Sequence, residues 1–379
     1  FALKFLVCHG KTEHEFCFNW RLPHMTPLNV LILGASYGSL LATKIVLAGH
    51  NAKMICLPAE ADLFNAGGAI IRTPVKGRDG LVEIRTNGLA GQLSAGGPAD
   101  CDPADFDLVV LAMQEPQYSS PGVRDLLQAV AKSGVPCMSI MNMPPLSFMK
   151  RLPNMDVESL RVCYAESTVW DAFDPEKFTL CSPDPQAFRP PEENLNVLQV
   201  RLPTNFKAAA FHHEQDNAML HRLQADIEAV RFTADDGAEI ELPVKLKVHD
   251  SVFVPLAKWA MLVAGNYRCV QKEEMRPIQD AVHHDLEQSR EIYNWVVELC
   301  IGLGGASADF VPFEKYANAA QSLGSPSSAA RALAAGAKNI ERVDKLVQTV
   351  AAQKGSHLPS LDETVALVDG WLEKNRAAS

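Results

Sequence analysis

The sequence has few of the features that mark disulfide-stapled, membrane-spanning or nucleic-acid-binding proteins. Its nine cysteines are an odd number and include no Cys-x-x-Cys pair. We therefore expect neither a disulfide framework nor a zinc ribbon, and we expect a reducing cytoplasm as the location. No apolar run approaches the roughly 20 residues that a membrane-spanning helix needs. The net charge of −10 argues against a nucleic-acid partner, because binding to phosphates requires a basic face.

The first 24 residues lack a clear hydrophobic period. They mix apolar, histidine and charged residues, and the chain begins with Phe1. We therefore interpret residues 1–24 as a non-native or disordered extension and Met25 as the native start. A secretory signal is the alternative, but the apolar stretch 5–8 is short and is followed by His9 and Lys11.

Buried strands and helices alternate in the first half of the chain. Residues 29–33 form an almost wholly apolar run, as expected for a strand covered on both faces. A turn of small residues, a helix over 39–48 and a strand over 52–57 complete a βαβ unit. Further strands are predicted at 107–112 and 136–141, with a helix between them at 123–131. This spacing predicts an α/β fold with a doubly wound parallel sheet of the Rossmann type.

The second half of the chain has a helical pattern. Residues 160–210 are rich in proline and contain short strand-like runs, which indicate an antiparallel extension or a connecting region. Helices are then predicted over 219–230, 252–269, 278–303, 328–352 and 360–372. We therefore expect a Rossmann domain with its extension over residues 25–210 and a mostly α-helical substrate and dimerisation domain over residues 211–379.

The turn Gly34-Ala35-Ser36-Tyr37-Gly38 joins the first strand to the first helix. Backbone N–H groups in such a turn, together with the helix N-terminus, can bind the pyrophosphate of NAD or NADP. The turn is one residue shorter than Gly-x-Gly-x-x-Gly and has serine in place of the middle glycine. A tight turn that binds nothing is one alternative. Another is the nucleophile elbow Gly-x-Ser-x-Gly, although only one strand precedes Ser36 and a hydrolase sheet would require several.

The second strand ends in the sequence Cys56-Leu57-Pro58-Ala59-Glu60, with no basic residue directly at its tip. An acidic residue there binds the ribose 2′-OH of NAD, whereas an arginine favours NADP. Glu60 fits the first role, and a solvated loop carboxylate is the equally open alternative. The sequence therefore leaves the choice between NAD and NADP open.

Four segments together resemble the ketopantoate reductase family: residues 33–42, residues 107–113 followed by 139–143, residues 258–266, and residues 278–304. Members of that family join a Rossmann domain to a helical domain and reduce a 2-oxo acid with NADPH. The third segment is the most specific, because Lys258 and Asn266 match the family's catalytic lysine and an asparagine eight residues later. Asn142 matches an asparagine that contacts both cofactor and substrate. The resemblance also implies a homodimer.

The resemblance implies a full set of site residues. The implied catalytic residues are Lys258, Asn266 and Glu341; the cofactor contacts are Gly34, Ala35, Ser36, Tyr37, Gly38, Met113, Gln114 and Asn142; the substrate contacts are Asn142, Lys258, Asn266, Ser327 and Ser328. Some positions depart from the family. Gln114 replaces a lysine, Leu262 an asparagine and Met143 a glycine. The family's late Ser and Glu fall on Ser327 and Asn339, or on Ser328 and Glu341 if one extra residue is allowed.

Lys258 suits the chemistry because hydride addition to a ketone builds negative charge on the oxygen, which an ammonium stabilises and protonates. Its neighbours over 253–257 and 259–261 are apolar, so we expect it to be partly desolvated; a snorkelling lysine is the alternative. Asn266 lies about two helical turns further on, and Asn142 lies at a strand's carboxyl end, where such sheets bind ligands. Helix capping or core hydrogen bonding would explain Asn266 without function.

The sequence therefore predicts a nicotinamide-dependent reductase that acts on a small 2-oxo acid or related carbonyl compound. An opine-type dehydrogenase and a non-catalytic nucleotide-binding protein stay open as alternatives. We expect no metal, since the pairs His212-His213 and His283-His284 are accompanied by no evident third and fourth ligand.

Overall fold

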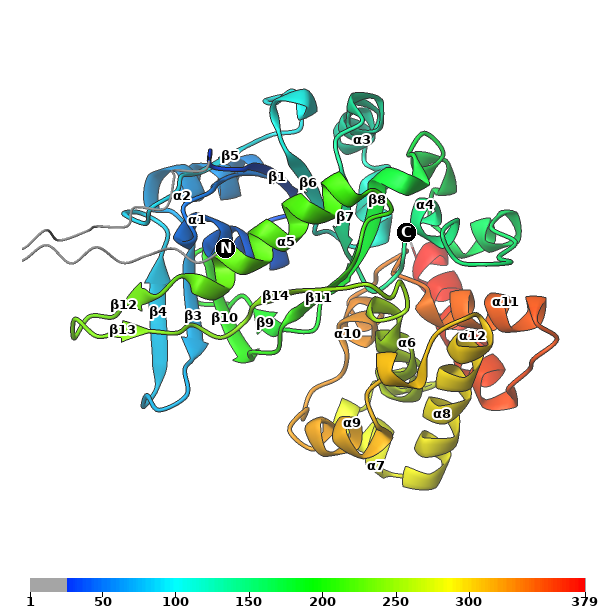
Figure 1. The fold of residues 1–379 in the computed structure, drawn as a ribbon. Coiled ribbons are helices and arrows are strands. Elements are labelled where there is room, and N and C mark those ends of the chain that lie inside the picture. The colour runs from blue at the N-terminus through cyan, green and yellow to red at the C-terminus, as the bar shows by residue number, and fades with distance from the viewer. Residues whose placement is uncertain (1–25, 379) are drawn as a thin grey trace, which may run out of the picture.

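The predicted buried strands form the centre of an eight-stranded sheet in the computed structural model, which describes residues 26–378 (Figure 1). The prediction about residues 1–24 lies outside the described residues. Neighbouring strands pair in parallel except β8 and β11, which are antiparallel. This is the predicted doubly wound α/β fold. In spatial order the strands are β14 (Leu246–His249), β11 (Phe206–Ala209), β8 (Phe178–Ser182), β7 (Cys137–Ile140), β6 (Leu108–Leu111), β1 (Asn29–Leu33), β2 (Asn51–Ile55) and β5 (Leu93–Gly96).

Strand β1 is apolar along its length because helices cover the sheet on both faces. Val30 and Ile32 pack into one core with helices α1 (Tyr37–Leu47) and α5 (Glu214–Ala229). Leu31 and Leu33 point the other way, into a core shared with α3 (Pro121–Ser133). Successive side chains of a strand face opposite ways, so a strand buried on both sides needs apolar residues at every position.

The structure contains a second, four-stranded sheet. Its order is β4 (Leu81–Arg85), β3 (Ile70–Pro74), β10 (Val197–Leu202) and β9 (Gln186–Phe188). Helix α2 (Pro58–Gly67) precedes β3, the short helix α4 (Leu146–Met149) follows β7, and β12 (Phe232–Thr233) pairs with β13 (Glu239–Ile240). The proline-rich region therefore supplies antiparallel strands, as expected, but its strand β8 also extends the parallel part of the main sheet.

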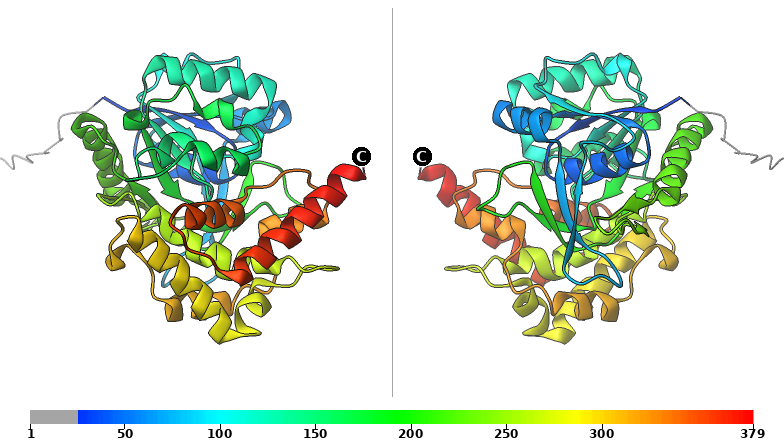
Figure 2. Two further views of the ribbon diagram at one scale, coloured as in Figure 1. Left: turned by 90° about the vertical axis from the view of Figure 1, so that its right-hand side faces the viewer. Right: turned by 90° about the vertical axis from the view of Figure 1, so that its left-hand side faces the viewer.

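Helices α6 to α12 gather beyond one end of the sheet (Figure 2). None of the helices within residues 26–378 is long and apolar enough to cross a bilayer. The helical bounds are α6 (Lys258–Met261), α7 (Ile278–His283), α8 (Leu286–Gly302), α9 (Phe313–Ala320), α10 (Ser328–Ala334), α11 (Val343–Gln353) and α12 (Pro359–Ala377).

Three helices that the sequence predicts as continuous are broken. The segment 252–269 is a series of short turns: a 3-10 turn at Pro255–Ala257, α6, a π-helical turn at Leu262–Asn266 and a 3-10 turn at Tyr267–Cys269. The predicted helix 278–303 divides into α7 and α8 at Asp285, whose side chain accepts the N–H of Gln288 and caps α8. The predicted helix 328–352 divides into α10 and α11 after Gly336, which has a φ of +89°.

The chain stays with the main sheet beyond residue 211. Helix α5 packs on α1, and β14 pairs with β11 at the edge of the sheet. The run of helices that forms the other half of the molecule starts only near Pro255. We therefore propose that the functional division of the chain lies near residue 250 rather than at 210.

Candidate active site

The glycine turn lies where β1, β2 and β6 end. Gly34 has a φ of +108°, and a Cβ atom there would lie 2.6 Å from the carbonyl oxygen of Ala112 and from Cγ of Met113. Its N–H donates to the carbonyl oxygen of Ile55 (2.9 Å). Only glycine adopts this backbone with so little room. The turn is thus seated at the carboxyl edge of the sheet, where doubly wound folds bind ligands.

The N-terminus of α1 has the donors that a pyrophosphate requires. Ser36 at the N-cap is exposed, and its side chain makes no capping hydrogen bond within the described structure; the first turn contains no acidic residue. The first N–H groups of a helix have no intrahelical partner, so this end carries partial positive charge. A Cβ atom at Gly38 would lie 2.8 Å from Ile32, so glycine there lets α1 approach β1 closely. The predicted phosphate-binding role fits this geometry.

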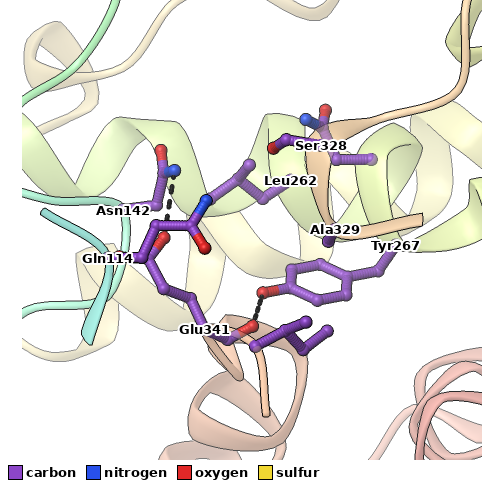
Figure 3. Close-up of a pocket in the computed structure, with 9 residues that line it drawn as sticks. Gln114, Asn142, Leu262, Tyr267, Ser328, Ala329 and Glu341 are labelled. Carbon is purple, nitrogen blue, oxygen red and sulfur yellow. Dashed lines mark hydrogen bonds between the residues drawn. The ribbon is translucent and has the colours of Figure 1, made fainter. Parts of the chain in front are cut away.

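Asn142 and Glu341 meet across the two halves of the molecule (Figure 3). Asn142 follows β7, Glu341 precedes α11, and Nδ2 of Asn142 donates to Oε2 of Glu341 (3.2 Å). A small cavity of about 20 Å³, with polar and apolar walls, adjoins the pair. That volume holds one water molecule but not a 2-oxo acid, so ligand binding requires the walls to separate. The cavity is lined by Gln114, Asn142, Leu262, Asn266, Tyr267, Ser328, Ala329, Ile340 and Glu341.

Burial raises the pKa of Glu341 to about 7, although hydrogen bonds from Asn142 and from the backbone of Glu115 oppose the shift. Glu115, which begins the 3-10 turn Glu115–Ser119 after β6, is a second buried carboxyl. Burial raises its pKa to about 7, although a hydrogen bond from the backbone N–H of Ala165 (3.2 Å) opposes the shift. A carboxyl with such a pKa can donate a proton near neutral pH. Glu115 was not predicted from the sequence, since a lone acidic residue in a loop gives no signal.

Two predicted residues approach the cavity from the helical half. Asn266 ends the π-helical turn and lines the cavity. Ser327 instead caps α10: its hydroxyl donates to the carbonyl oxygen of Asn266 (2.7 Å) and accepts the N–H of Ala330 (3.2 Å). Ser328 lines the cavity beside it. Ser327 therefore holds the backbone of Asn266 in place, and Ser328 is the serine that lines the cavity.

Glu341, and not Asn339, lies in the cavity. Tyr267 was not predicted, and its hydroxyl donates to the carbonyl oxygen of Glu341 (2.5 Å) and accepts the N–H of Val343 (3.0 Å). Asn339 is exposed and accepts a hydrogen bond from Arg376 (3.0 Å). Of the two alignments left open by the sequence, the geometry therefore favours the one with Ser328 and Glu341.

Lys258 forms its ion pair with Asp184. It begins α6, one helical turn before Leu262 of the cavity wall, and its Nζ lies 3.4 Å from Oδ1 of Asp184. Asp184 also pairs with Lys207 (3.0 Å). Burial alone would raise the pKa of Asp184, but the charges of Lys258 and Lys207 hold it below its usual value. The ammonium is thus held by a buried carboxylate that the sequence did not reveal.

Tyr37 connects the glycine turn to both of these groups. Burial raises the pKa of its hydroxyl to about 12, and the negative charges of Asp184 and Glu341 contribute to the rise. The hydroxyl lies against the backbone of Ala187, which opposes the shift. The turn, the lysine's partner and the cavity carboxyl therefore border one region between the halves of the molecule.

Both carboxylate oxygens of Glu60 contact protein groups. Its Oε2 accepts the N–H of Leu57 (3.0 Å), and its Oε1 pairs with Arg189 (2.5 Å). Glu60 is therefore held in place by these two contacts rather than lying free in a solvated loop. Within residues 26–378, no group of three or more His, Cys, Asp or Glu residues could hold a metal ion, and His283 contacts the carbonyl oxygen of Ala317 (3.0 Å).

Comparison with known proteins identifies the fold. No family model matches the sequence, and no curated protein matches it. Among solved structures, the 2-dehydropantoate 2-reductase of Methylococcus capsulatus has a TM-score of 0.62 at 13% identity, covering 92% of this chain and 98% of its own. The enzyme of Geobacter metallireducens GS-15 has a TM-score of 0.61 at 11% identity, covering 90% and 99%.

A third likeness is to D-mandelate dehydrogenase, solved as a ternary complex with NADH and anilino(oxo)acetate. Its TM-score is 0.59 at 11% identity, and the match covers 92% of this chain and 100% of that one. The whole described chain thus has the fold of ketopantoate reductases, as the sequence resemblance implied. At these identities the likeness establishes the fold, and any activity has to be argued from the site.

Proposed function

We propose that this protein is a nicotinamide-nucleotide-dependent reductase that converts a small 2-oxo acid or a related carbonyl compound to the hydroxy compound. The observation that carries the proposal is the Asn142–Glu341 pair, a protonatable carboxyl held at the carboxyl edge of the sheet beside Asn266. The structural neighbours, which are 2-dehydropantoate 2-reductases and a D-mandelate dehydrogenase, support the same reaction class.

The nucleotide would lie along the carboxyl edge of the sheet. The turn from Gly34 to Gly38, with Ala35, Ser36 and Tyr37, would hold the pyrophosphate, while Met113, Gln114 and Asn142 would border the nicotinamide. When bound, a reduced nicotinamide supplies the hydride. Every other requirement of the reaction, namely holding the carbonyl compound and stabilising the charge on its oxygen, falls to the protein.

Glu341 and Lys258 are the proposed donors to the carbonyl oxygen. Neutral Glu341 can donate its proton, and Asn142 holds the carboxyl in place. Lys258 pairs with Asp184 through one contact, and its remaining N–H donors could reach the oxygen once the cavity walls separate. Asn266 and Ser328 would orient the substrate from the helical wall. A small-molecule substrate is the partner that this function requires, and the homodimer suggested by the resemblance stays a prediction.

Nucleotide titration followed by an activity screen tests the proposal. We expect NADH or NADPH to bind at micromolar levels by fluorescence and a panel of 2-oxo acids to include one that oxidises the bound nucleotide. Lys258→Ala should leave nucleotide binding intact and lower turnover at least about a hundredfold, the usual contribution of a general acid.

Lys207→Ala is the matched control, because it removes the other lysine that pairs with Asp184. It should lower turnover much less than Lys258→Ala does. If neither nucleotide binds, the proposal is wrong. If a nucleotide binds but both lysine variants turn over at the wild-type rate, Lys258 has no part in the reaction.

A further inference from the structure

The π-helical turn at Leu262–Asn266 sets which side chains of the helical half face the cavity. The backbone N–H of Tyr267 donates to the carbonyl oxygen of Leu262, five residues earlier, which is the π-helical pattern. In an α-helix, residues five apart point about 140° away from each other, whereas in a π-helical turn they lie nearly one above the other. Leu262 and Tyr267 both line the cavity. The π-helical turn therefore brings Tyr267 onto the cavity side.

Side chains from α9 and from the start of α10 hold this turn in place. The hydroxyl of Tyr316 on α9 donates to the carbonyl oxygen of Met261 (3.0 Å). The hydroxyl of Ser327 donates to the carbonyl oxygen of Asn266 (2.7 Å). A Cβ atom at Gly265 would lie 2.0 Å from the Tyr316 hydroxyl oxygen, so Tyr316 reaches the turn only because that position is glycine. These contacts fix the π-helical turn at both of its ends.

Tyr267 in turn binds the main chain on both sides of Arg342, just before α11. Its buried hydroxyl donates to the carbonyl oxygen of Glu341 (2.5 Å, Figure 3) and accepts the N–H of Val343 (3.0 Å). The phenol thus holds the backbone from which the Glu341 side chain extends. Asn142 holds the far end of that side chain through Oε2 (3.2 Å). The Glu341 carboxyl is therefore held from the helical half and from the sheet together.

Tyr267 exerts this hold without carrying charge. Burial raises the pKa of its hydroxyl well above the usual value, so it is neutral near pH 7. Glu115, Tyr37 and Tyr118 are the neighbouring titratable groups that interact with Glu341. Burial raises the pKa of both of these tyrosines as well, so Glu115 is the neighbour that titrates near neutral pH. Removing the Tyr267 hydroxyl changes no charge, and a change in the pKa of Glu341 would report a change in its position.

We propose that Tyr267, brought onto the cavity side by the π-helical turn, is a positioning residue that holds Glu341 where it can donate a proton to the substrate carbonyl. This inference rests on the proposed function, in which Glu341 is a proton donor. The Tyr267 hydroxyl is bonded to the main chain, so Tyr267 acts through Glu341 and not on the reacting atoms.

NMR titration of isotope-labelled glutamate carboxyls measures this positioning without turnover, and the variant Glu341→Gln identifies the Glu341 signal. In wild-type protein this signal should titrate near pH 7, because burial raises the pKa of Glu341 to about 7. In Tyr267→Phe the main chain is released and the carboxyl becomes more solvated, so the midpoint should fall by at least about one pH unit. The same variant should lower kcat at neutral pH at least about tenfold and change KM less than about threefold, because a misplaced proton donor affects the chemical step.

Tyr293→Phe is the matched control. Tyr293 on α8 is buried, and its hydroxyl donates to the carbonyl oxygen of Val311 (2.6 Å). Neither of these residues lines the cavity. The control variant loses the same kind of hydrogen bond, and it should keep both the wild-type midpoint of Glu341 and the wild-type kcat.

Should Tyr267→Phe fail to fold, Tyr316→Phe tests the same idea, since it releases the carbonyl of Met261 and should also lower the Glu341 midpoint. A midpoint that stays at its wild-type value in the variant tested overturns the role of Tyr267 and leaves the proposed function standing. An equal fall in Tyr293→Phe overturns it too. If the midpoint falls as expected but wild-type protein reduces no 2-oxo acid, the positioning of Glu341 stands and the proposed function is wrong.

Discussion

At the scale of single residues, the protonation of Glu341 should control the rate. Burial raises its pKa to about 7, so it carries the proton it would donate below that pH and loses it above. For reduction of the carbonyl compound, we expect kcat to fall about tenfold per pH unit above pH 7, because a single group must be protonated. A pH–rate profile measures this directly.

The variants Glu341→Gln and Glu115→Gln distinguish which of the two buried carboxyls controls the pH dependence of kcat. Both carboxyls have a pKa of about 7, but Glu341 lines the cavity with Asn142 and Glu115 binds backbone N–H groups. Glu341→Gln should lower kcat and flatten the pH–rate profile. Glu115→Gln should keep the decrease of kcat above pH 7. If kcat of Glu341→Gln still decreases above pH 7, a group other than Glu341 causes the decrease.

The site residues predicted from the sequence are those that regular elements bring together. Asn142 and Gln114 follow neighbouring parallel strands, so their meeting at one edge follows from the topology. The partners of Lys258 and Glu60 could not be predicted. Asp184 and Arg189 lie 74 and 129 residues away in the sequence, and their placement depends on how the proline-rich region packs.

At the scale of elements, the β1–α1 turn depends on glycine at position 34. Its φ is +108°, and a Cβ atom would press on Ala112 and Met113 at 2.6 Å. We expect Gly34→Ala to lower the free energy of unfolding by about 2–5 kcal/mol, the sum of backbone strain and overpacking. Urea unfolding measures the loss.

Gly77→Ala is the control for this turn. Gly77 has a φ of +80°, but no heavy atom lies within 4 Å of the position its Cβ would occupy. It should therefore cost only the backbone part, about 1–2 kcal/mol. Equal losses in the two variants would mean that the turn relaxes away from Ala112 without cost.

The fold of the first half was predictable because β1 and β6 are almost wholly apolar runs, which are typical of strands buried in parallel sheets. The helix breaks were harder to predict. Hydrophobic spacing continues through Asp285 and Gly336, so periodicity alone joins the helices, although a capping aspartate and a glycine mark both breaks. The π-helical turn at Leu262–Asn266 depends on tertiary packing, because α7 and α8 pack against it.

At the scale of the whole molecule, the contacts beside the small cavity are the ones that ligand binding has to disturb. The hydrogen bond between Asn142 and Glu341 joins the sheet to the helices, and Lys258 joins α6 to Asp184 after β8. A cavity of about 20 Å³ cannot admit a 2-oxo acid unless these contacts lengthen. Both contacts lie at the boundary between the sheet and the helices, so we expect opening to occur there.

The two halves share one hydrophobic core and should unfold together. Leu31 of β1, Val109 of β6, Leu346 of α11 and Leu372 of α12 all belong to the same buried cluster. A two-domain chain with separate cores would unfold in two steps. We expect far-ultraviolet circular dichroism and tryptophan fluorescence to report one coincident transition in urea. Leu346→Ala should shift both signals together by about 2–5 kcal/mol, the usual cost of truncating a buried leucine.

The control for this shared core is Leu286→Ala, since Leu286 at the start of α8 is 36% exposed. Its truncation should move the transition much less than Leu346→Ala does, because little apolar surface returns to water. Two resolved transitions, with Leu346→Ala displacing only one of them, would show that the helical half folds on its own. The interface at Asn142 and Glu341 would then be a contact between independent domains, and substrate entry would require their separation as rigid bodies.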